Sequence, residues 1–132
     1  MKIAVIGASG NAGSRIVTEL ARRGHAVTAI ARHPEKVKAE ANVTPTQGDL
    51  MDQAALARLL AGHDAAISSV HFLASDPAKL IGAARDSKVG RYLVVGGAGS
   101  LEVAPGVRLV TTPGFPVAYK AEAEKGAAFL DL

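Results

Sequence analysis

The chain has 132 residues, no cysteine and a formal net charge of +3. Its 48% hydrophobic and 20% charged residues are typical of one compact globular domain, here residues 1–132, and the lack of cysteine excludes disulfides and thiolate metal sites. The charge forms no basic stripe, which argues against nucleic-acid binding, and the four histidines lack metal-ligand spacing. No apolar run is long enough to span a membrane and no secretory signal pattern is present, so we expect a soluble protein. The absence of cysteine favours a reducing cytoplasm.

Short apolar runs alternate with helical periodicity along the chain. Pro77 after a capping Asp76 is a strong helix start, and Pro45 in the third strand fits a sheet edge. Five βα steps in this order predict a doubly wound parallel sheet, a Rossmann fold with three αβα layers. The predicted strands cover residues 2–7, 25–32, 42–49, 64–70 and 91–97, and the helices between them cover residues 11–24, 52–62 and 76–90.

The last third of the chain is less regular. Residues 96–119 have no clear periodicity, and a loop of this length at the carboxyl ends of the strands is expected to have a function. A final helix is predicted over residues 120–132, where Phe129, Leu130 and Leu132 need covering by further residues or by a second copy in a homodimer.

The segment GASGNAG, residues 7–13, places three glycines between the first strand and the first helix. Such a turn lets backbone amides approach a pyrophosphate at the positive end of the helix dipole. We expect Gly7 to permit the tight turn, Gly10 the close approach of phosphate and Gly13 the packing of helix on strand. A purely structural turn is the alternative, but the strand before and the helix after favour dinucleotide binding. The predicted contacts are Gly7, Ser9, Gly10, Asn11, Ala12 and Gly13.

The end of the second strand indicates which nicotinamide cofactor is preferred. An acidic residue there would bond the ribose 2′-hydroxyl of NAD, but this position holds Arg32, followed by His33 and Lys36. A guanidinium binds a 2′-phosphate that a carboxylate would repel. NADP is therefore the predicted cofactor, with NAD as the alternative. The structural interpretation is an exposed arginine at the start of a surface turn.

These motifs resemble a known family. The GxxGxxG spacing is similar to that of the short-chain dehydrogenase/reductase superfamily. More narrowly, KIAVIGASGNAGSRIV, ARHPEK, GDL and LVVGGAGSLEVAPG resemble its atypical NmrA-like group, often described as NADH-flavin reductases. The resemblance runs through nearly the whole chain and implies an NAD(P)-binding Rossmann domain. Family members continue into a sixth strand and a small substrate-covering region, so the resemblance also implies that the C-terminal part of the family fold is missing. Either the sequence is incomplete, or the protein is a minimal version with a more open site.

The resemblance assigns further residues to the cofactor. It places Asp49 at the adenine amino group with Leu50 beside the ring, and it places Ser68 and Ser69 near the nicotinamide ribose. Each pair has a structural alternative. Asp49 follows Gly48 at a strand end and fits a turn, and the two serines fit a crowded crossing that needs small residues.

The catalytic residues depart from the superfamily. The usual Tyr-x-x-x-Lys pair is absent, because Ala123 stands four residues after Tyr119 and Lys120 is its direct neighbour. Carbonyl reduction needs a positioned acid. Reduction of a flavin or quinone needs less, since hydride goes to an electron-poor ring and water can supply the proton. The missing pair therefore favours a small-molecule acceptor such as FMN, FAD or a quinone.

Ser100 and Tyr119 are the catalytic candidates. Ser100 matches the family's serine region and is expected either to bond an acceptor carbonyl or to bond its own turn. Tyr119 and Phe115 either stack on an isoalloxazine ring or anchor the loop, and anchoring is the favoured role. His71 after the fourth strand is expected to be a solvated loop residue rather than a nicotinamide contact.

Three functions are consistent with the sequence. The first is NADPH-dependent reduction of a flavin or quinone, and the second is non-catalytic, NADP-dependent redox sensing of the NmrA type. The third is a nucleotide-sugar epimerase or dehydratase, which the missing Tyr-x-x-x-Lys pair weakens. Turnover with an acceptor distinguishes the first from the second, and competition by nucleotide sugars identifies the third.

Overall fold

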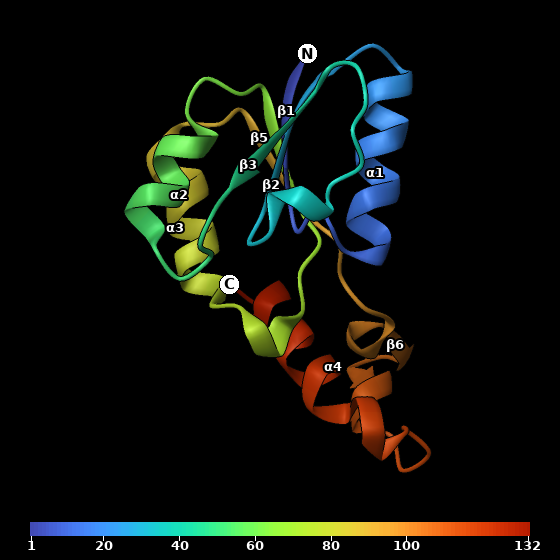
Figure 1. The fold of residues 1–132 in the computed structure, drawn as a ribbon. Helices are drawn as coiled ribbons and strands as arrows, with labels where there is room; N and C mark the ends of the chain where they lie inside the picture. Colours follow the sequence, from blue (N-terminus) through green and yellow to red (C-terminus); the bar gives the residue numbers. More distant parts are fainter.

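A computed structural model describes residues 1–132, and its centre is a sheet of five parallel strands (Figure 1). The spatial order is β3-β2-β1-β4-β5, which is the doubly wound order, so the predicted fold class is confirmed. Pro45 lies in β3 at the edge of the sheet, where its missing N–H is tolerated. The strands are β1 (Lys2–Ile6), β2 (Ala26–Ala31), β3 (Val43–Gln47), β4 (Ala65–Ser68) and β5 (Arg91–Val94).

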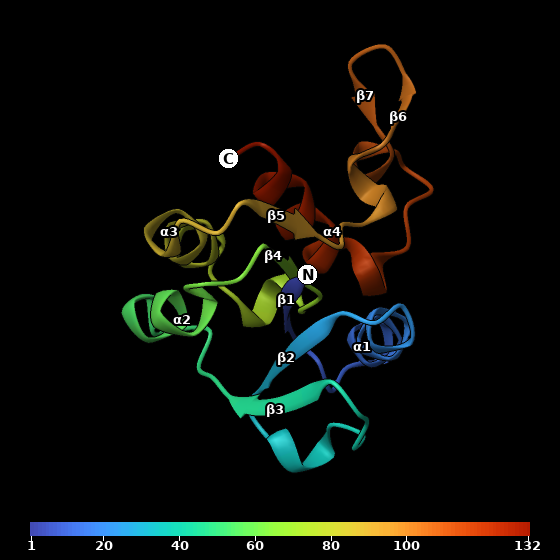
Figure 2. The same ribbon diagram turned by 90° about the horizontal axis from the view of Figure 1, so that it is seen from above.

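Helices cover the two faces of this sheet unequally. Figure 2 shows α1 (Asn11–Arg22) on one face and α2 (Gln53–Leu60) beside α3 (Pro77–Ser87) on the other. On the α1 side, Leu93 of β5 remains 48% exposed. No helix is both long and apolar enough to cross a membrane.

The starts of α2 and α3 follow from local chemistry. The Asp52 carboxylate accepts the Ala55 N–H at 3.0 Å, and the Asp76 carboxylate accepts the Ala78 N–H at 3.0 Å. Pro77 is the first residue of α3, where its missing N–H would have no helical partner in any case. The predicted caps are therefore confirmed.

The core has one part on each side of the sheet. β1 is apolar along its length rather than alternating, because both of its faces are covered. Toward α1 the core contains Val5, Val17 and Val27. Toward α2 and α3 a larger core includes Ile6, Ile30, Leu56, Leu60, Leu80 and, from the far end of the chain, Phe129.

The connection between β2 and β3 corrects the expectation of five regular βα steps. It holds only the short 3-10 helix η1 (Pro34–Lys36) instead of a crossover helix. Val37, directly after it, is buried in the core on the α1 side. This single apolar contact anchors the connection, whose other residues up to Ala41 are exposed or half-buried.

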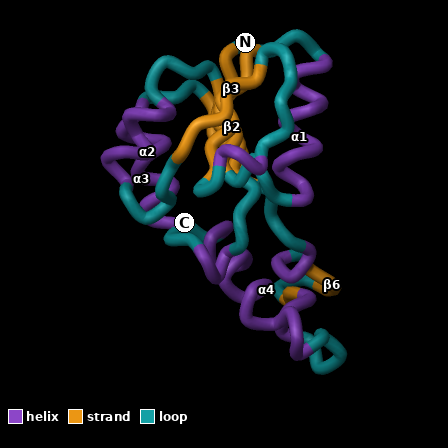
Figure 3. The backbone as a smooth tube through the Cα atoms, in the orientation of Figure 1, coloured by secondary structure: helices purple, strands orange, loops and turns teal.

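After β5 the chain leaves the sheet and folds below the carboxyl ends of the strands (Figures 1 and 3). The final helix α4 (Val117–Leu130) begins three residues earlier than predicted. The stretch before it was predicted to lack periodicity, and the structure adds a hairpin there. The hairpin consists of β6 (Glu102–Ala104) and β7 (Val107–Arg108), and the short 3-10 helices η3 (Ala98–Ser100) and η4 (Leu109–Thr111) lie before and after it.

Candidate cofactor site

The turn from β1 to α1 needs two of its three glycines for protein packing. Gly7 has φ +83°, and a Cβ there would lie 2.1 Å from the Ser69 carbonyl oxygen. A Cβ on Gly13 would lie 2.0 Å from the Gly7 carbonyl oxygen. Side chains at either position would therefore push the turn away from β4 or push α1 away from the turn.

Gly10 is different, because protein packing restricts it less than it restricts Gly7 and Gly13. Its φ of −75° suits any residue, and a Cβ there would meet only the Gly7 carbonyl oxygen, at 3.3 Å. Gly10 is exposed at the start of α1. Its missing side chain leaves room for a ligand to approach the backbone, as a dinucleotide pyrophosphate does in such turns.

The start of α1 also offers unused hydrogen-bond donors. The first helical bond runs from the Ser14 N–H to the Gly10 carbonyl, so the N–H groups of Asn11, Ala12 and Gly13 have no acceptor in the protein. No side chain caps this end of α1, and its first turn contains no acidic residue. Ser9 is exposed in the same turn. These residues fit an anionic group such as a pyrophosphate.

Arg32 follows β2 directly and is exposed. It takes part in none of the ion pairs of the structure, whereas its neighbour His33 has Nδ1 3.5 Å from Glu35 Oε1. Lys36 is also exposed. The guanidinium is free to meet a phosphate, and its role in selecting the cofactor stays a prediction.

The residues after β3 are partly used by the protein. One carboxylate oxygen of Asp49 accepts the Met51 N–H at 2.9 Å, which is the strand-end turn that the sequence allowed. Leu50 is half-buried against the core beside α2. Asp49 is exposed and keeps its second oxygen free of protein contacts, so an adenine contact stays a prediction.

The two serines at the end of β4 lie at a crowded crossing. The Ser68 side chain is 1% exposed, and its hydroxyl lies 2.8 Å from the Tyr92 hydroxyl. Burial raises the pKa of Tyr92, while the hydrogen bond to Ser68 acts in the opposite direction. The Ser69 carbonyl lies against Gly7. The Ser68 hydroxyl is therefore engaged inside the protein, and contacts of either serine with a ribose stay predictions.

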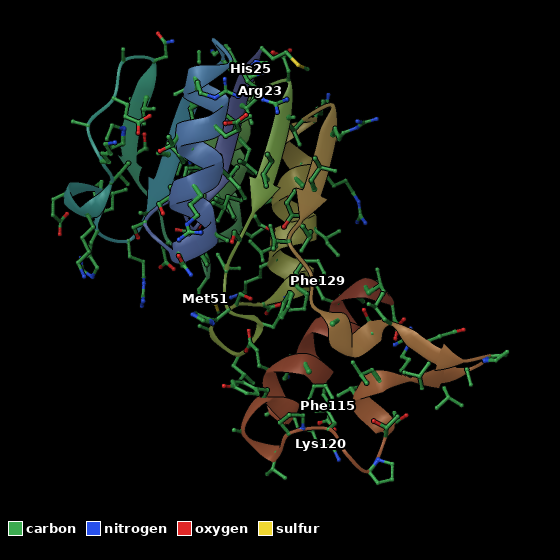
Figure 4. The ribbon with its side chains drawn as sticks, turned by 90° about the vertical axis from the view of Figure 1, so that its right-hand side faces the viewer. Arg23, His25, Met51, Phe115, Lys120 and Phe129 are labelled. Atoms are coloured by element: carbon green, nitrogen blue, oxygen red, sulfur yellow. The ribbon has the colours of Figure 1, made fainter.

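The structure does not join the two catalytic candidates through a hydrogen bond. The Ser100 hydroxyl donates to the Gly97 carbonyl at 3.2 Å, within its own turn. Tyr119 on the first turn of α4 is 68% exposed, and its hydroxyl makes no hydrogen bond within the protein. Figure 4 shows Phe115 and Lys120 in the part of the molecule that extends away from the sheet. The catalytic roles of Ser100 and Tyr119 thus remain predictions.

Sequence reasoning missed a contact between α4 and the loop after β4. The Glu122 carboxylate accepts the backbone N–H groups of Phe72 and Leu73, at 2.5 and 2.9 Å. No local signal could reveal this contact, since the partners lie about fifty residues apart. His71, in the same loop, has an 89% exposed side chain, and its Nδ1 lies 3.8 Å from Glu122 Oε1. No three His, Asp or Glu side chains are arranged to hold a metal ion.

The geometry of the glycine turn agrees with the protein family that the sequence matches. Residues 7–130 match a protein family described as NAD(P)H-binding. The chain belongs to this NAD(P)H-binding family. The match begins at Gly7 and ends at the last residue of α4, so it includes the glycine turn, the sheet and the C-terminal segment. The predicted membership of the NAD(P)-binding Rossmann proteins is confirmed.

Three similar proteins differ in their functional assignment. The chain is 41% identical over 126 residues to the uncharacterized protein YwnB of Bacillus subtilis. It is 39% identical to a provisionally assigned NADH-flavin reductase of Streptococcus pneumoniae, with a TM-score of 0.79 over 100% of this chain. It is 34% identical to a provisionally assigned epimerase of Bacteroides thetaiotaomicron, with a TM-score of 0.89 over 97% of this chain.

These proteins are longer than this chain. The alignments cover 90% of this chain but 59% of YwnB, and they cover 65% and 62% of the two solved structures. The shared part contains the nucleotide-binding sheet and the glycine turn.

Proposed function

We propose that the protein is an NADPH-dependent reductase that transfers hydride to a flavin or a quinone. The observation that carries this proposal is the turn at Gly10. There an exposed glycine, whose added Cβ would meet only one protein atom, lies beside three backbone N–H groups without acceptors. A dinucleotide pyrophosphate matches both features, because it needs close approach and several donors.

Arg32 supports NADPH over NADH. It stands where NAD-binding proteins of this fold carry an acidic residue, it is exposed, and no carboxylate of the chain neutralises it. Planar guanidinium donors bind phosphate through two parallel hydrogen bonds. The 2′-phosphate of NADPH would therefore be held at the end of β2.

The absence of the Tyr-x-x-x-Lys pair supports a flavin or a quinone as the hydride acceptor. When bound, the reduced nicotinamide supplies a hydride, which is the chemistry that the protein itself cannot provide. Tyr119 is exposed and without a hydrogen-bond partner, and Ala123 occupies the position of the superfamily lysine. With no proton donor positioned by the chain, the proton is expected to come from water. A flavin or quinone accepts a hydride and a proton in this way, and the chain's own task is to bind and orient the reactants.

Epimerisation of a nucleotide sugar is the second candidate. It is favoured by one observation, namely the provisional epimerase assignment of the Bacteroides thetaiotaomicron structure. The same missing Tyr-x-x-x-Lys pair argues against it, since reversible oxidation of a sugar hydroxyl needs a positioned base.

Anaerobic oxidation of NADPH by the purified protein, with FMN and then a benzoquinone as acceptor, tests the proposal. We expect protein-dependent loss of NADPH absorbance. The Arg32→Glu variant should lower kcat/KM for NADPH by about 100-fold while changing that for NADH by less than about threefold, because a charged hydrogen-bonded pair is replaced by repulsion. Tight binding without turnover would contradict the reductase and favour the sensor. Competition by nucleotide sugars would favour the epimerase.

A further inference from the structure

The loop between β4 and α3, residues 69–75, lies next to the cofactor turn. The Ser69 N–H donates to the Ile6 carbonyl at 2.9 Å, and a Cβ on Gly7 would meet both Ser69 and Val70. The first part of the loop is thus fixed by β1. In a doubly wound sheet the β1–β2 side holds the adenine half of a dinucleotide and the β4 side holds the nicotinamide half.

The rest of this loop is held by α4 rather than by the sheet. Glu122 uses both carboxylate oxygens, accepting the Phe72 N–H at 2.5 Å and the Leu73 N–H at 2.9 Å. The short 3-10 helix η2 (Phe72–Ala74) has no side-chain cap of its own. Glu122 therefore satisfies two backbone donors that the loop itself leaves without a partner.

Two other residues of α4 contact the same loop. A Cβ on Gly126 would lie 2.7 Å from the Phe72 ring, so the absence of a side chain there lets the ring lie directly on the helix. The rings of Phe72 and Phe129 meet edge to face, with centroids 5.9 Å apart and planes at 65°. Figure 4 shows Phe129 at the junction between the sheet and the C-terminal segment.

Glu122, Gly126 and Phe129 follow the spacing i, i+4, i+7, which places them on one face of α4. The Glu122 carboxylate, the Gly126 backbone and the Phe129 ring therefore all contact the β4–α3 loop. On the same helix Glu124 is exposed and makes no hydrogen bond or ion pair, so the chain offers a matched acidic residue without this function.

We propose that Glu122 is a positioning residue, which through the backbone of Phe72 and Leu73 holds the β4–α3 loop as a wall of the nicotinamide half of the site. This inference rests on the cofactor site proposed above. It predicts that α4 affects the nicotinamide half of a bound dinucleotide and leaves the adenine half unaffected. Glu122 acts through the loop backbone, and its Oε1 also lies 3.8 Å from Nδ1 of the exposed His71 in the same loop.

The test compares two ligands. NADPH reaches both halves of the site, whereas adenosine 2′,5′-bisphosphate reaches only the adenine half. Their dissociation constants are measured for the wild type, Glu122→Ala, Glu122→Gln and the control Glu124→Gln, together with backbone amide exchange of residues 70–75. Thermal unfolding of each variant shows that it is folded.

We expect Glu122→Ala to weaken NADPH about tenfold, to change the bisphosphate less than about twofold and to speed amide exchange in the loop. Glu122→Gln keeps one acceptor oxygen and should fall between alanine and the wild type, and Glu124→Gln should match the wild type. Equal weakening of both ligands by Glu122→Ala, or no change in either, would overturn the positioning role.

The test also distinguishes this inference from the proposed activity. A wild type that binds NADPH but does not reduce any acceptor would contradict the reductase, while the two affinities would still decide the role of Glu122. A wild type that binds neither ligand would overturn both proposals.

Discussion

The sheet region, residues 1–95, and the C-terminal segment, residues 96–132, are built differently. In the sheet region, helices on both faces create two apolar cores, and strands such as β1 are buried almost completely. In the C-terminal segment only Gly99, Val110, Ala127 and Phe129 are buried. The hairpin β6–β7 projects away from the rest of the chain (Figure 2).

The difference shows where each region obtains its order. The sheet region is held by its own apolar packing, which is the main stabilising contribution in a domain of this size. The C-terminal segment is held at few points, through Phe129 in the core and through Glu122 at the loop after β4. Substitutions in the two regions should therefore have different consequences.

The largest effect is expected for Gly7→Ala in the sheet region. A methyl group would meet the Ser69 carbonyl at 2.1 Å and would stand at φ +83°, so we expect a loss of more than about 3 kcal/mol in the free energy of unfolding. Chemical denaturation measures this loss. Gly96→Ala is the control in the C-terminal segment, because nothing lies within 4 Å of its added Cβ. Equal effects of the two substitutions would remove the distinction between the regions.

A smaller but still large effect is expected for Phe129→Ala. Phe129 is 7% exposed and is the main apolar contact of α4 with the core, so its truncation should lower the free energy of unfolding by about 3 kcal/mol. Leu130→Ala, at 66% exposure, should change it by less than about 0.5 kcal/mol. Limited proteolysis should cut Phe129→Ala first within residues 96–132. Cleavage first within the sheet would show that α4 is not anchored by this residue.

The smallest effect concerns charges on the surface of α1. Hydrogen bonds from Arg22 and Arg23 lower the pKa of Glu19 from 4.5 to about 2. A carboxyl group whose pKa is lowered by folding stabilises the folded state at pH values above its ordinary pKa. This stabilisation is lost as the pH falls to the pKa of the folded state. Wild type should thus be slightly more stable than Glu19→Gln at pH 6 and should lose this small advantage by about pH 2. An equal difference in unfolding midpoint at both values would contradict the assignment.

Most of the sheet region could be predicted from the sequence because its signals are local. Apolar runs, the Asp76-Pro77 start of α3 and the edge position of Pro45 depend on neighbouring residues only. The glycine turn was predicted from its place between a strand and a helix, and the structure adds that Gly10 differs from Gly7 and Gly13.

The rest could not be predicted because it depends on contacts between distant segments. The hydrogen bond between Ser68 and Tyr92, and the contact of Glu122 with the loop at Phe72, join residues 24 and 50 positions apart. Periodicity carries no information about such pairs. The hairpin was missed although its Pro105-Gly106 turn is a recognised signal, because its strands are too short to show alternation.

The turn at Gly10 is the proposed binding site of the dinucleotide pyrophosphate. The most direct measurement is a fluorescence titration of the wild type and Gly10→Ala with NADPH, alongside their thermal unfolding. We expect Gly10→Ala to weaken NADPH binding about tenfold or more, while the unfolding midpoint falls by no more than about 5 °C, since alanine is a poorer N-cap than glycine and its Cβ lies 3.3 Å from the Gly7 carbonyl oxygen. Unchanged NADPH affinity in a folded Gly10→Ala protein would contradict the claim.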